Sequence, residues 1–301
     1  MTVVQASELE YFGVAADSKP AAAATRATFY ETDSGRTFIY TGSAWVRYVK
    51  PADVGARSRF IAQLLGILGS SALRIWLPDG TDTTTSTDKT KNQATLTHNA
   101  TLAGRLRRQG NGWAASFDGS THFSYFPDAA DLSFGDGSLD NGFSVVMLVK
   151  ITNTANTRTL FGKFTTNQRE YRAYVSTTDL VVFETYDQSA SATERATSDA
   201  AVPQDALALL TFTYDGSEDS DGFIIYVNGV AVASTKASDS GGTYTAMENL
   251  TSVLGIGTGT NLASLPFQGE IAAFTISSGA LTADQIWQLR NAFDGYFDFL
   301  G

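Results

Sequence analysis

From residue 72 onward, short apolar stretches follow one another along the chain, separated by clusters of Gly, Asp, Asn and Ser. The clearest example is FIIYVNGVAVAS, in which Asn228-Gly229 joins two stretches of alternating apolar residues. Asn-Gly is the preferred pair for the tight type I′ turn of an antiparallel hairpin. Many such strands with almost no helix between them predict an all-β sandwich of two antiparallel sheets.

The predicted strands and one late helix can be placed from the same patterns. Thr282 and Gln285 have the spacing of a capping box, and Leu281 and Ile286 that of a hydrophobic staple, so a helix is predicted over Leu281–Phe293. The clearest predicted strands are Ala72–Leu77, Ala114–Phe117, Thr121–Phe126, Gly142–Thr152, Thr159–Phe164, Tyr171–Ser176, Leu180–Tyr186, Leu207–Tyr214, Phe223–Asn228, Val230–Ser234, Ser252–Gly257 and Gln268–Ser277.

A separate small module is predicted ahead of the sandwich. In FYETDSGRTFIYTGSAWVRYV, residues 29–49, alternating aromatics are interrupted by turn signals at 33–35 and 41–43, which predicts a short antiparallel β-meander. So small a sheet cannot bury both of its faces alone. We therefore expect its aromatic residues to pack against copies of the module or against a docking surface. The expected docking or oligomerisation residues are Tyr11, Phe12, Phe29, Tyr30, Phe38, Tyr40, Trp45 and Tyr48.

The sequence thus divides into three predicted parts. Residues 1–52 form the N-terminal β module, residues 53–71 form a helical connector, and residues 72–301 form the sandwich. The connector is predicted to be helical over Ala56–Leu68, where Phe60, Leu64 and Leu68 recur at helical spacing. Its apolar stripe is expected to pack on the sandwich or, alternatively, on helices of a partner.

Composition restricts the function classes. The formal charge of −10 and the pI near 4.6 argue against nucleic acid and against anionic membranes as partners, because both attract Lys/Arg patches. The chain contains no Cys, which excludes disulfides and thiolate chemistry. The sequence shows neither a secretory signal pattern nor an apolar window of membrane-spanning length.

A series of motifs from residue 72 to 293 resembles a known family. The order IWLPDG, SFDGSTHFSY, GFSVVMLVKI, TLFGKF, LLTFTYDG, GFIIYVNGVAVAS and FQGEIAAFTISSGALTADQIWQL is similar to that of laminin-G-like, concanavalin-A-like jelly-roll domains. The resemblance implies two antiparallel sheets of about six or seven strands each, one of them concave. It leaves function open, because this fold serves lectins, hydrolases, adhesion modules and virion proteins.

The opening stretch carries a second resemblance. YFGVAADSKP followed by ATFYETDSGRTFIYTGSAWVRYV is similar to short N-terminal modules of tailed-phage structural proteins. Thr28 replaces a frequent Gly of that pattern, and Phe38-Ile39-Tyr40 stands where Tyr and Trp are usual. The resemblance implies a protein of a phage particle, made in the bacterial cytoplasm and ending on the virion surface, with a homotrimer as the expected assembly.

Enzymatic chemistry is not expected. Glycosidases on this fold need paired carboxylates on one strand. The nearest string, Glu31-Thr32-Asp33, has Arg36 in place of the last acid and lies outside the sandwich. His98 and His122 have no obvious acidic companion in the sequence, and we expect both at the surface or rim. No catalytic residues are predicted.

Two kinds of binding site remain open. Ca²⁺ is the possible cofactor, because acid-rich loops supply the oxygen ligands that it prefers. Trp76, Trp113 and Trp287 are expected in the core, which leaves tyrosines as possible glycan platforms. The candidate glycan contacts are Tyr125, Tyr186 and Tyr244, and the candidate Ca²⁺ ligands are Asp215, Glu218, Asp219 and Asp221 in one loop and Asp136, Asp140 and Asn141 in another.

The leading hypothesis is a non-enzymatic structural protein of a tailed-phage virion, either a capsid decoration, a head fibre or a tail appendage. The N-terminal module would anchor it to the capsid shell or another virion protein. The jelly roll would then cement its neighbours or adhere to cell-surface glycans. The alternatives are a lectin-like module of a tail fibre for host recognition and, less favoured, a glycoside hydrolase.

Overall fold

A computed structural model describes residues 4–7, 10–13, 28–31, 37–40, 45–48, 51–80, 82–152, 155–259 and 265–300. The chain divides into two compact units, residues 1–58 and 59–301, and each is considered by itself. Within the described ranges, no helix combines the length and the apolar character needed to cross a membrane.

The N-terminal unit contains a five-stranded sheet in the order β1-β2-β3-β4-β5. Its last three strands form the predicted antiparallel meander, but β1 and β2 were not predicted, and β2 pairs parallel with β3, so the sheet as a whole is not a simple meander. The paired backbones place Tyr11, Phe29 and Phe38 in one row. The strands are β1 (Val4–Ser7), β2 (Glu10–Gly13), β3 (Thr28–Glu31), β4 (Thr37–Tyr40) and β5 (Trp45–Tyr48).

The predicted docking side chains of this unit lie outside the described residues, with one exception. Tyr40 is described, and it is half-buried. The expectation that these aromatic residues pack on a partner or on further copies therefore stays a prediction.

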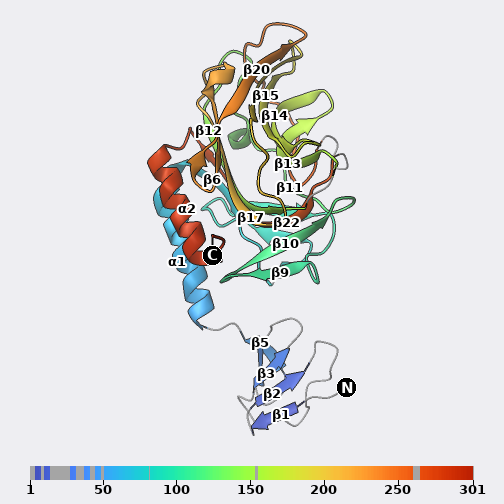
Figure 1. The fold of residues 1–301 in the computed structure, drawn as a ribbon, viewed down its shortest axis with the longest axis vertical. Coiled ribbons are helices and arrows are strands. Elements are labelled where there is room, and N and C mark those ends of the chain that lie inside the picture. The colour runs from blue at the N-terminus through green and yellow to red at the C-terminus, as the bar shows by residue number, and fades with distance from the viewer. Residues whose placement is uncertain are drawn as a thin grey trace. The chain divides into compact units, whose positions relative to one another are not determined.

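The second unit is a two-sheet antiparallel sandwich, as predicted (Figure 1). Its eight-stranded sheet consists, in spatial order, of β19 (Val230–Ala231), β18 (Phe223–Val227), β17 (Leu207–Tyr214), β12 (Phe143–Ile151), β22 (Gln268–Ser278), β10 (Gly112–Asp118) and β9 (Leu106–Gln109), with β6 (Ala72–Trp76) also paired to β22. Its nine-stranded sheet consists of β20 (Ser234–Ser240), β16 (Ala192–Ser198), β15 (Val181–Asp187), β14 (Gln168–Val175), β13 (Arg158–Thr165), β21 (Leu254–Ile256), β11 (Ser124–Phe126), β8 (Thr95–His98) and β7 (Thr85–Thr87).

Within the sandwich, the sequence patterns missed β7, β8, β9, β16 and β20. They are rich in Thr, Ser, Arg and Glu, so they carry little apolar alternation. The predicted strand Thr121–Phe126 begins only at Ser124, because Asp118 folds the preceding residues into a turn. Its Oδ1 accepts the backbone N–H groups of Ser120, Thr121 and His122 at 3.0, 2.8 and 2.9 Å.

The core between the sheets is dominated by aromatic rings. Phe143 on β12 stacks on Phe134 with ring centroids 4.3 Å apart, and it lies 4.7 Å from the ring of Tyr171 on β14. Phe183 on β15 approaches Phe143 edge-on at 5.6 Å. These contacts join the two sheets and fix which face of β14 and β15 is left for solvent.

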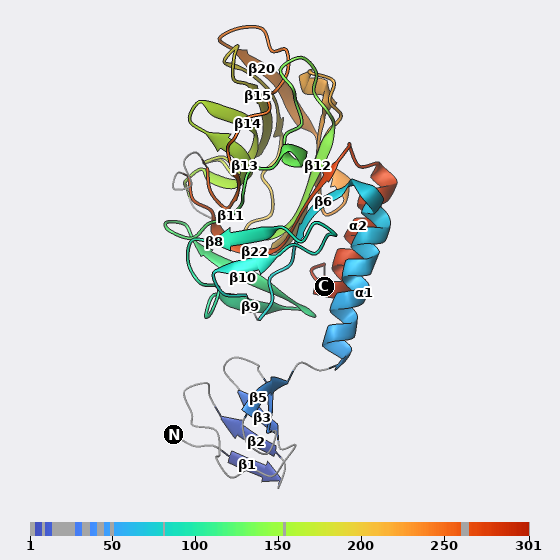
Figure 2. The same ribbon diagram turned by 180° about the vertical axis from the view of Figure 1, so that it is seen from behind.

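Helix α2 (Ala283–Phe297) and the part of helix α1 (Pro51–Leu68) from residue 59 onward lie side by side against the outer surface of the eight-stranded sheet (Figure 2). Helix α1 confirms the predicted connector helix and is followed by the 3₁₀ turn η1 (Gly69–Ser71). Phe60 of α1 stacks on Tyr296 of α2 with centroids 4.5 Å apart. The capping box of Thr282 and Gln285 is present as predicted. The apolar stripe of the connector therefore packs within the chain.

Three sequence expectations about polar and aromatic residues need correction. Trp287 is 61% exposed on α2, so it is not a core residue, and Trp113 is only partly buried, whereas Trp76 is buried as expected. His98 is buried rather than at the rim, because Ser86 and Ser124 bond its two ring nitrogens at 2.7 Å each. Burial lowers the pKa of His98 to about 4, so the ring stays neutral at pH 7. His122 does have an acidic neighbour, Asp118, at 3.6 Å.

Candidate functional site: an arginine–aromatic groove on the nine-stranded sheet

A groove of about 290 Å³ lies on the outer face of the nine-stranded sheet, the face turned away from the core. We call it the arginine–aromatic groove. Its described lining residues all come from the strands β13, β14, β15 and β16. They are Phe164, Arg169, Arg172, Tyr174, Glu184, Tyr186, Thr193 and Arg195.

Strand alternation explains why these side chains share one face. Because successive residues of a strand point to opposite faces, the burial of Ala173 and Phe183 in the core directs their sequence neighbours outward. The backbone register then places Arg172 of β14, Glu184 of β15 and Arg195 of β16 directly opposite one another in a single row. The floor of the groove is thus a line of alternating positive and negative charge.

Arg172 occupies the centre of the groove. Its guanidinium carbon lies 4.1 Å from the ring centroid of Phe164 and 4.7 Å from that of Tyr174. Its Nε donates to Glu184 Oε1 at 2.5 Å. Burial raises the pKa of Glu184, and the charge of Arg172 offsets part of that effect. Arg195 in turn forms an ion pair with Asp239 of β20.

Arg169 lies in the corner formed by Phe164 and Tyr186, whose rings meet edge-on with centroids 5.7 Å apart. Its guanidinium carbon is 5.0 Å from the Tyr186 ring and 5.6 Å from the Phe164 ring. Its Nη1 donates to the Tyr186 hydroxyl at 3.0 Å. Its Nε is buried and has no hydrogen-bond partner among the described residues. Both cation–π contacts hold the guanidinium in place without neutralising it.

The three tyrosines that the sequence suggested as glycan contacts are separated by the fold. Tyr186 lines the groove. Tyr125 is half-buried on β11 of the same sheet, three strands away from Arg172 in the same backbone row and outside the groove. Tyr244 is half-buried, and its hydroxyl donates to Asp140 Oδ2 at 2.7 Å, which commits its polar end to the protein itself.

The acid-rich loops proposed for Ca²⁺ make mostly local contacts. Asp215 Oδ1 accepts from the Ser217 backbone and Asp219 Oδ1 from the Asp221 backbone, so each shapes its own turn, the second being the 3₁₀ turn η3 (Ser220–Gly222). Asp136 likewise accepts the backbone N–H groups of residues 138 and 139. Among the described residues, no three His, Asp or Glu side chains come together as a metal site.

Asp140 joins three loops instead. Its Oδ2 accepts the hydroxyl groups of Tyr214 and Tyr244 at 2.7 Å each, and its Oδ1 accepts the Met247 backbone N–H at 2.8 Å. Its own backbone N–H donates to Glu218 Oε1 at 3.0 Å, which brings members of both acid-rich loops together. Asn141 follows in the chain, and its backbone N–H donates to the Phe134 carbonyl. These contacts explain Asp140 as a structural residue.

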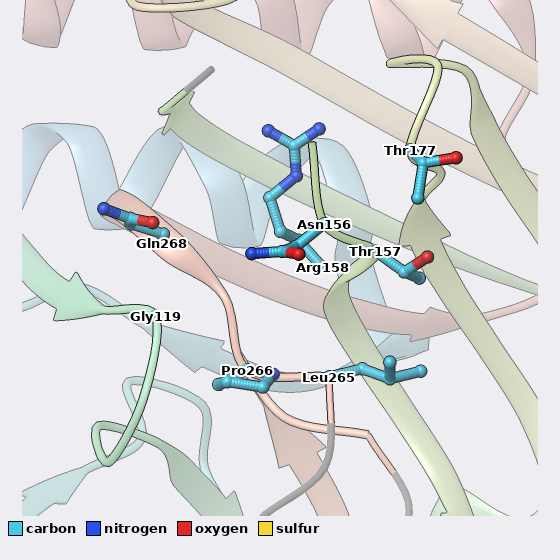
Figure 3. A pocket seen from close by; sticks show the side chains of 8 residues that line it. All are labelled: Gly119, Asn156, Thr157, Arg158, Thr177, Leu265, Pro266 and Gln268. Carbon is cyan, nitrogen blue, oxygen red and sulfur yellow. The ribbon is translucent and has the colours of Figure 1, made fainter. Parts of the chain in front are cut away.

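Figure 3 shows a second pocket, of about 270 Å³. It is lined by Gly119, Asn156, Thr157, Arg158, Thr177, Leu265, Pro266 and Gln268. The only cation in this lining, Arg158, points away from Leu265 and Pro266 (Figure 3) and is paired with Asp179 at 2.5 Å. The pocket offers amides and hydroxyls but no aromatic ring, so it lacks the flat apolar surface on which a sugar ring stacks.

Sequence reasoning identified Tyr186 but missed Phe164, Arg169, Arg172 and Glu184. The alternation RAY at 172–174 and ETY at 184–186 does place each outer pair on one face of its strand. What the sequence does not contain is the register between β14 and β15, which brings the two pairs together.

The comparisons with known proteins agree with this architecture. The model of the concanavalin A-like lectin/glucanases superfamily matches residues 118–287, more than half of the chain. The chain therefore belongs to that superfamily. A comparison with curated proteins found no match.

Several solved structures share the fold. Domain 4 of AbnA, an extracellular arabinanase of family GH43 from Geobacillus stearothermophilus solved with arabinotriose, has a TM-score of 0.50 at 20% identity, covering 73% of this chain and 98% of that one. The binding domain of Paraclostridial Mosquitocidal Protein 1 gives 0.55 at 11% identity, covering 75% and 53%. The botulinum neurotoxin serotype D ligand-binding domain, solved with N-acetylneuraminic acid, gives 0.53 at 12%, covering 76% and 52%. The chain spans about half the length of those toxin domains.

Proposed function

We propose that this protein is a non-catalytic, lectin-like module that binds glycans in the arginine–aromatic groove. The observation that carries the proposal is the position of the half-buried rings of Tyr174 and Tyr186 beside polar side chains on one sheet face, where Arg169 and Arg172 contact the buried ring of Phe164. Aromatic rings give a sugar a flat apolar surface for stacking. The neighbouring Thr, Arg and Glu groups supply donors and acceptors for its hydroxyls.

The structural neighbours support a binding role. One was solved with arabinotriose and another with N-acetylneuraminic acid. Their identities to this chain are only 20% and 12%, so the likeness shows a shared fold and not a shared ligand. The proposal that the protein binds glycans therefore rests on the residues of the groove.

A binding role fits the groove better than glycoside hydrolysis does. Hydrolysis of a glycosidic bond uses two carboxyl groups that flank the bond. Of the described residues that line the groove, Glu184 alone is a carboxylate, and it is bonded to Arg172 at 2.5 Å. We therefore assign it to holding the guanidinium in place.

A glycan array with the full chain tests the proposal. We expect binding to a restricted set of glycans, and we expect Tyr186→Ala to weaken it by about tenfold or more, because the ring and the hydroxyl that orients Arg169 are both lost. Tyr125→Ala is the matched control, since it removes a half-buried tyrosine from the same sheet. Binding to no glycan, or a loss with Tyr125→Ala but not with Tyr186→Ala, would contradict the assignment.

We propose further that the N-terminal unit attaches this module to a tailed-phage particle. The support is the resemblance of residues 11–49 to phage modules and the separation of residues 1–58 as a compact unit. Deletion of residues 1–52 followed by mass measurement in solution tests this role. A trimer that becomes monomeric and no longer joins particles is the expected outcome, and an unchanged oligomer that still joins particles would refute it.

A further inference from the structure

The charge balance of the arginine–aromatic groove points to a property of its ligand, and this inference rests on the proposed glycan binding. The described residues that line the groove include three arginines. Arg172 is paired with Glu184, and Arg195 is paired with Asp239. Arg169 forms no ion pair with any carboxylate that the structure describes. The groove therefore presents one positive charge in excess, in a chain whose formal charge is −10.

The Arg169 guanidinium is also incompletely hydrogen-bonded. One contact of its side chain is to the Tyr186 hydroxyl, a neutral partner, at 3.0 Å. Its Nε is shielded from solvent and has no partner among the described residues. Because Nε is shielded, a ligand would reach the guanidinium at its terminal nitrogens. An ionised acceptor there would form a charge-assisted hydrogen bond, which is stronger than one to a neutral acceptor.

Its neighbours restrict how a ligand could approach. Phe164 and Tyr186 flank the guanidinium and hold its plane through contacts of 5.6 and 5.0 Å to their ring centroids. Tyr186 and Arg169 both line the groove, together with Arg172 and Tyr174. Because the Arg169 guanidinium carbon lies 5.0 Å from the Tyr186 ring centroid, a sugar bound beside Tyr186 would lie next to the guanidinium.

We propose that the groove selects an anionic sugar, whose carboxylate or sulfate is bound by Arg169. An anion would meet a charged donor that no carboxylate of the described residues already occupies. A neutral sugar would keep the stacking but leave the guanidinium without its acceptor. Discrimination of about tenfold is expected for one charge-assisted contact of this kind.

Titration calorimetry with matched probes tests the proposal on the full chain. The probes are methyl glucuronide against methyl glucoside, which differ in the carboxylate, and galactose 6-sulfate against galactose, which differ in the sulfate. We expect one acidic probe to bind about tenfold more tightly than its neutral partner. The two pairs distinguish a carboxylate from a sulfate ligand. The preference should shrink as the salt concentration rises.

Arg169→Gln should reduce the acidic preference to less than about twofold. Arg107→Gln is the matched control, because Arg107 is an exposed arginine on β9 of the other sheet. Equal binding of acidic and neutral probes, a preference that survives Arg169→Gln, or an equal loss with Arg107→Gln would overturn the proposal. Neutral binding that depends on Tyr186 without acidic preference would refute this inference alone, whereas binding of no sugar would refute both. Near-ultraviolet circular dichroism of each variant checks that the fold is retained.

Discussion

Arg172 and Glu184 lie directly opposite each other on β14 and β15, and Arg172 Nε donates to Glu184 Oε1 at 2.5 Å. The side chain of Glu184 is 5% exposed and that of Arg172 is 19% exposed, so most of the pair is shielded from water. The two residues together form the centre of the groove floor. Stability and binding are therefore expected to depend on the same pair.

Replacing the acid of this pair should destabilise the fold. Glu184→Ala leaves Arg172 without its carboxylate in a largely shielded position, and we expect a loss of roughly 2–3 kcal/mol in the free energy of unfolding, measured by urea denaturation. Asp239→Ala is the control, because the Asp239 side chain is 54% exposed and pairs with Arg195 near solvent. It should cost less than about 1 kcal/mol. Equal losses for the two variants would mean that shielding does not set the strength of these pairs.

The contact between the two helices should contribute strongly to the stability of the second unit. Phe60 is 1% exposed and packs against Tyr296, Phe293 and Phe297 with centroid distances of 4.5 to 5.7 Å. Phe60→Ala should cost about 3–5 kcal/mol, because it leaves a cavity among three aromatic rings. Trp287→Ala removes an exposed aromatic from α2 and should change the free energy of unfolding by less than about 0.5 kcal/mol. A small effect of Phe60→Ala would show that the helix pair contributes little.

A buried acid in β14 should make stability depend on pH. Glu170 is fully buried, and burial raises its pKa to about 7 even though Lys163 Nζ lies 3.1 Å from its Oε1. The folded state therefore holds a proton that the unfolded chain releases near pH 4.5. The contribution of Glu170 to stability is then fully present below about pH 4.5 and is lost as the pH rises to about 7.

Comparison of the wild type with Glu170→Gln isolates that contribution. We expect the wild type to lose stability relative to the variant between pH 4.5 and 7, by up to roughly 3 kcal/mol. Urea titrations at a series of pH values measure the difference. Parallel pH profiles of the two proteins would contradict the raised pKa of Glu170.

The Tyr186 hydroxyl should affect selectivity more than overall affinity. Tyr186→Phe keeps the ring for stacking but removes the acceptor that orients Arg169 Nη1 at 3.0 Å. We expect the affinity for neutral sugars to stay within about twofold and the preference for acidic sugars to fall about threefold. Calorimetry with the matched probes measures both quantities. An equal loss for acidic and neutral sugars would mean that the hydroxyl contacts the sugar itself.

Calcium should have little effect on stability. The carboxylates of Asp136, Asp215 and Asp219 already accept backbone N–H groups in their own turns, and Asp140 has three donors. We expect the melting temperature to stay within about 1 °C between EDTA and millimolar Ca²⁺. If a loop bound Ca²⁺, a free Ca²⁺ concentration of 100 times the dissociation constant would instead stabilise the fold by about 2.7 kcal/mol. A clear rise in melting temperature with Ca²⁺ would therefore show that one of the acid-rich loops binds calcium.

The sequence alone predicted the sandwich class and its C-terminal helix, because alternation, Asn228-Gly229 and the capping residues Thr282 and Gln285 are local signals. It missed β16, whose outward Thr and Arg residues alternate with Ala and Glu rather than with large apolar residues. Of the groove it predicted Tyr186 alone. The remaining groove residues depend on which strands become neighbours, and that is decided by packing of the core rather than by any local pattern.

The row of Arg172, Glu184 and Arg195 stands on three hydrogen-bonded strands rather than on loops. The binding surface would therefore already have its bound conformation, and little binding free energy would be lost in ordering protein side chains or loops. The spacing between the two guanidinium groups is set by the distance between strands. Insertions or deletions in the connecting loops could change the rim of the sandwich during evolution and leave this row of charged residues unchanged.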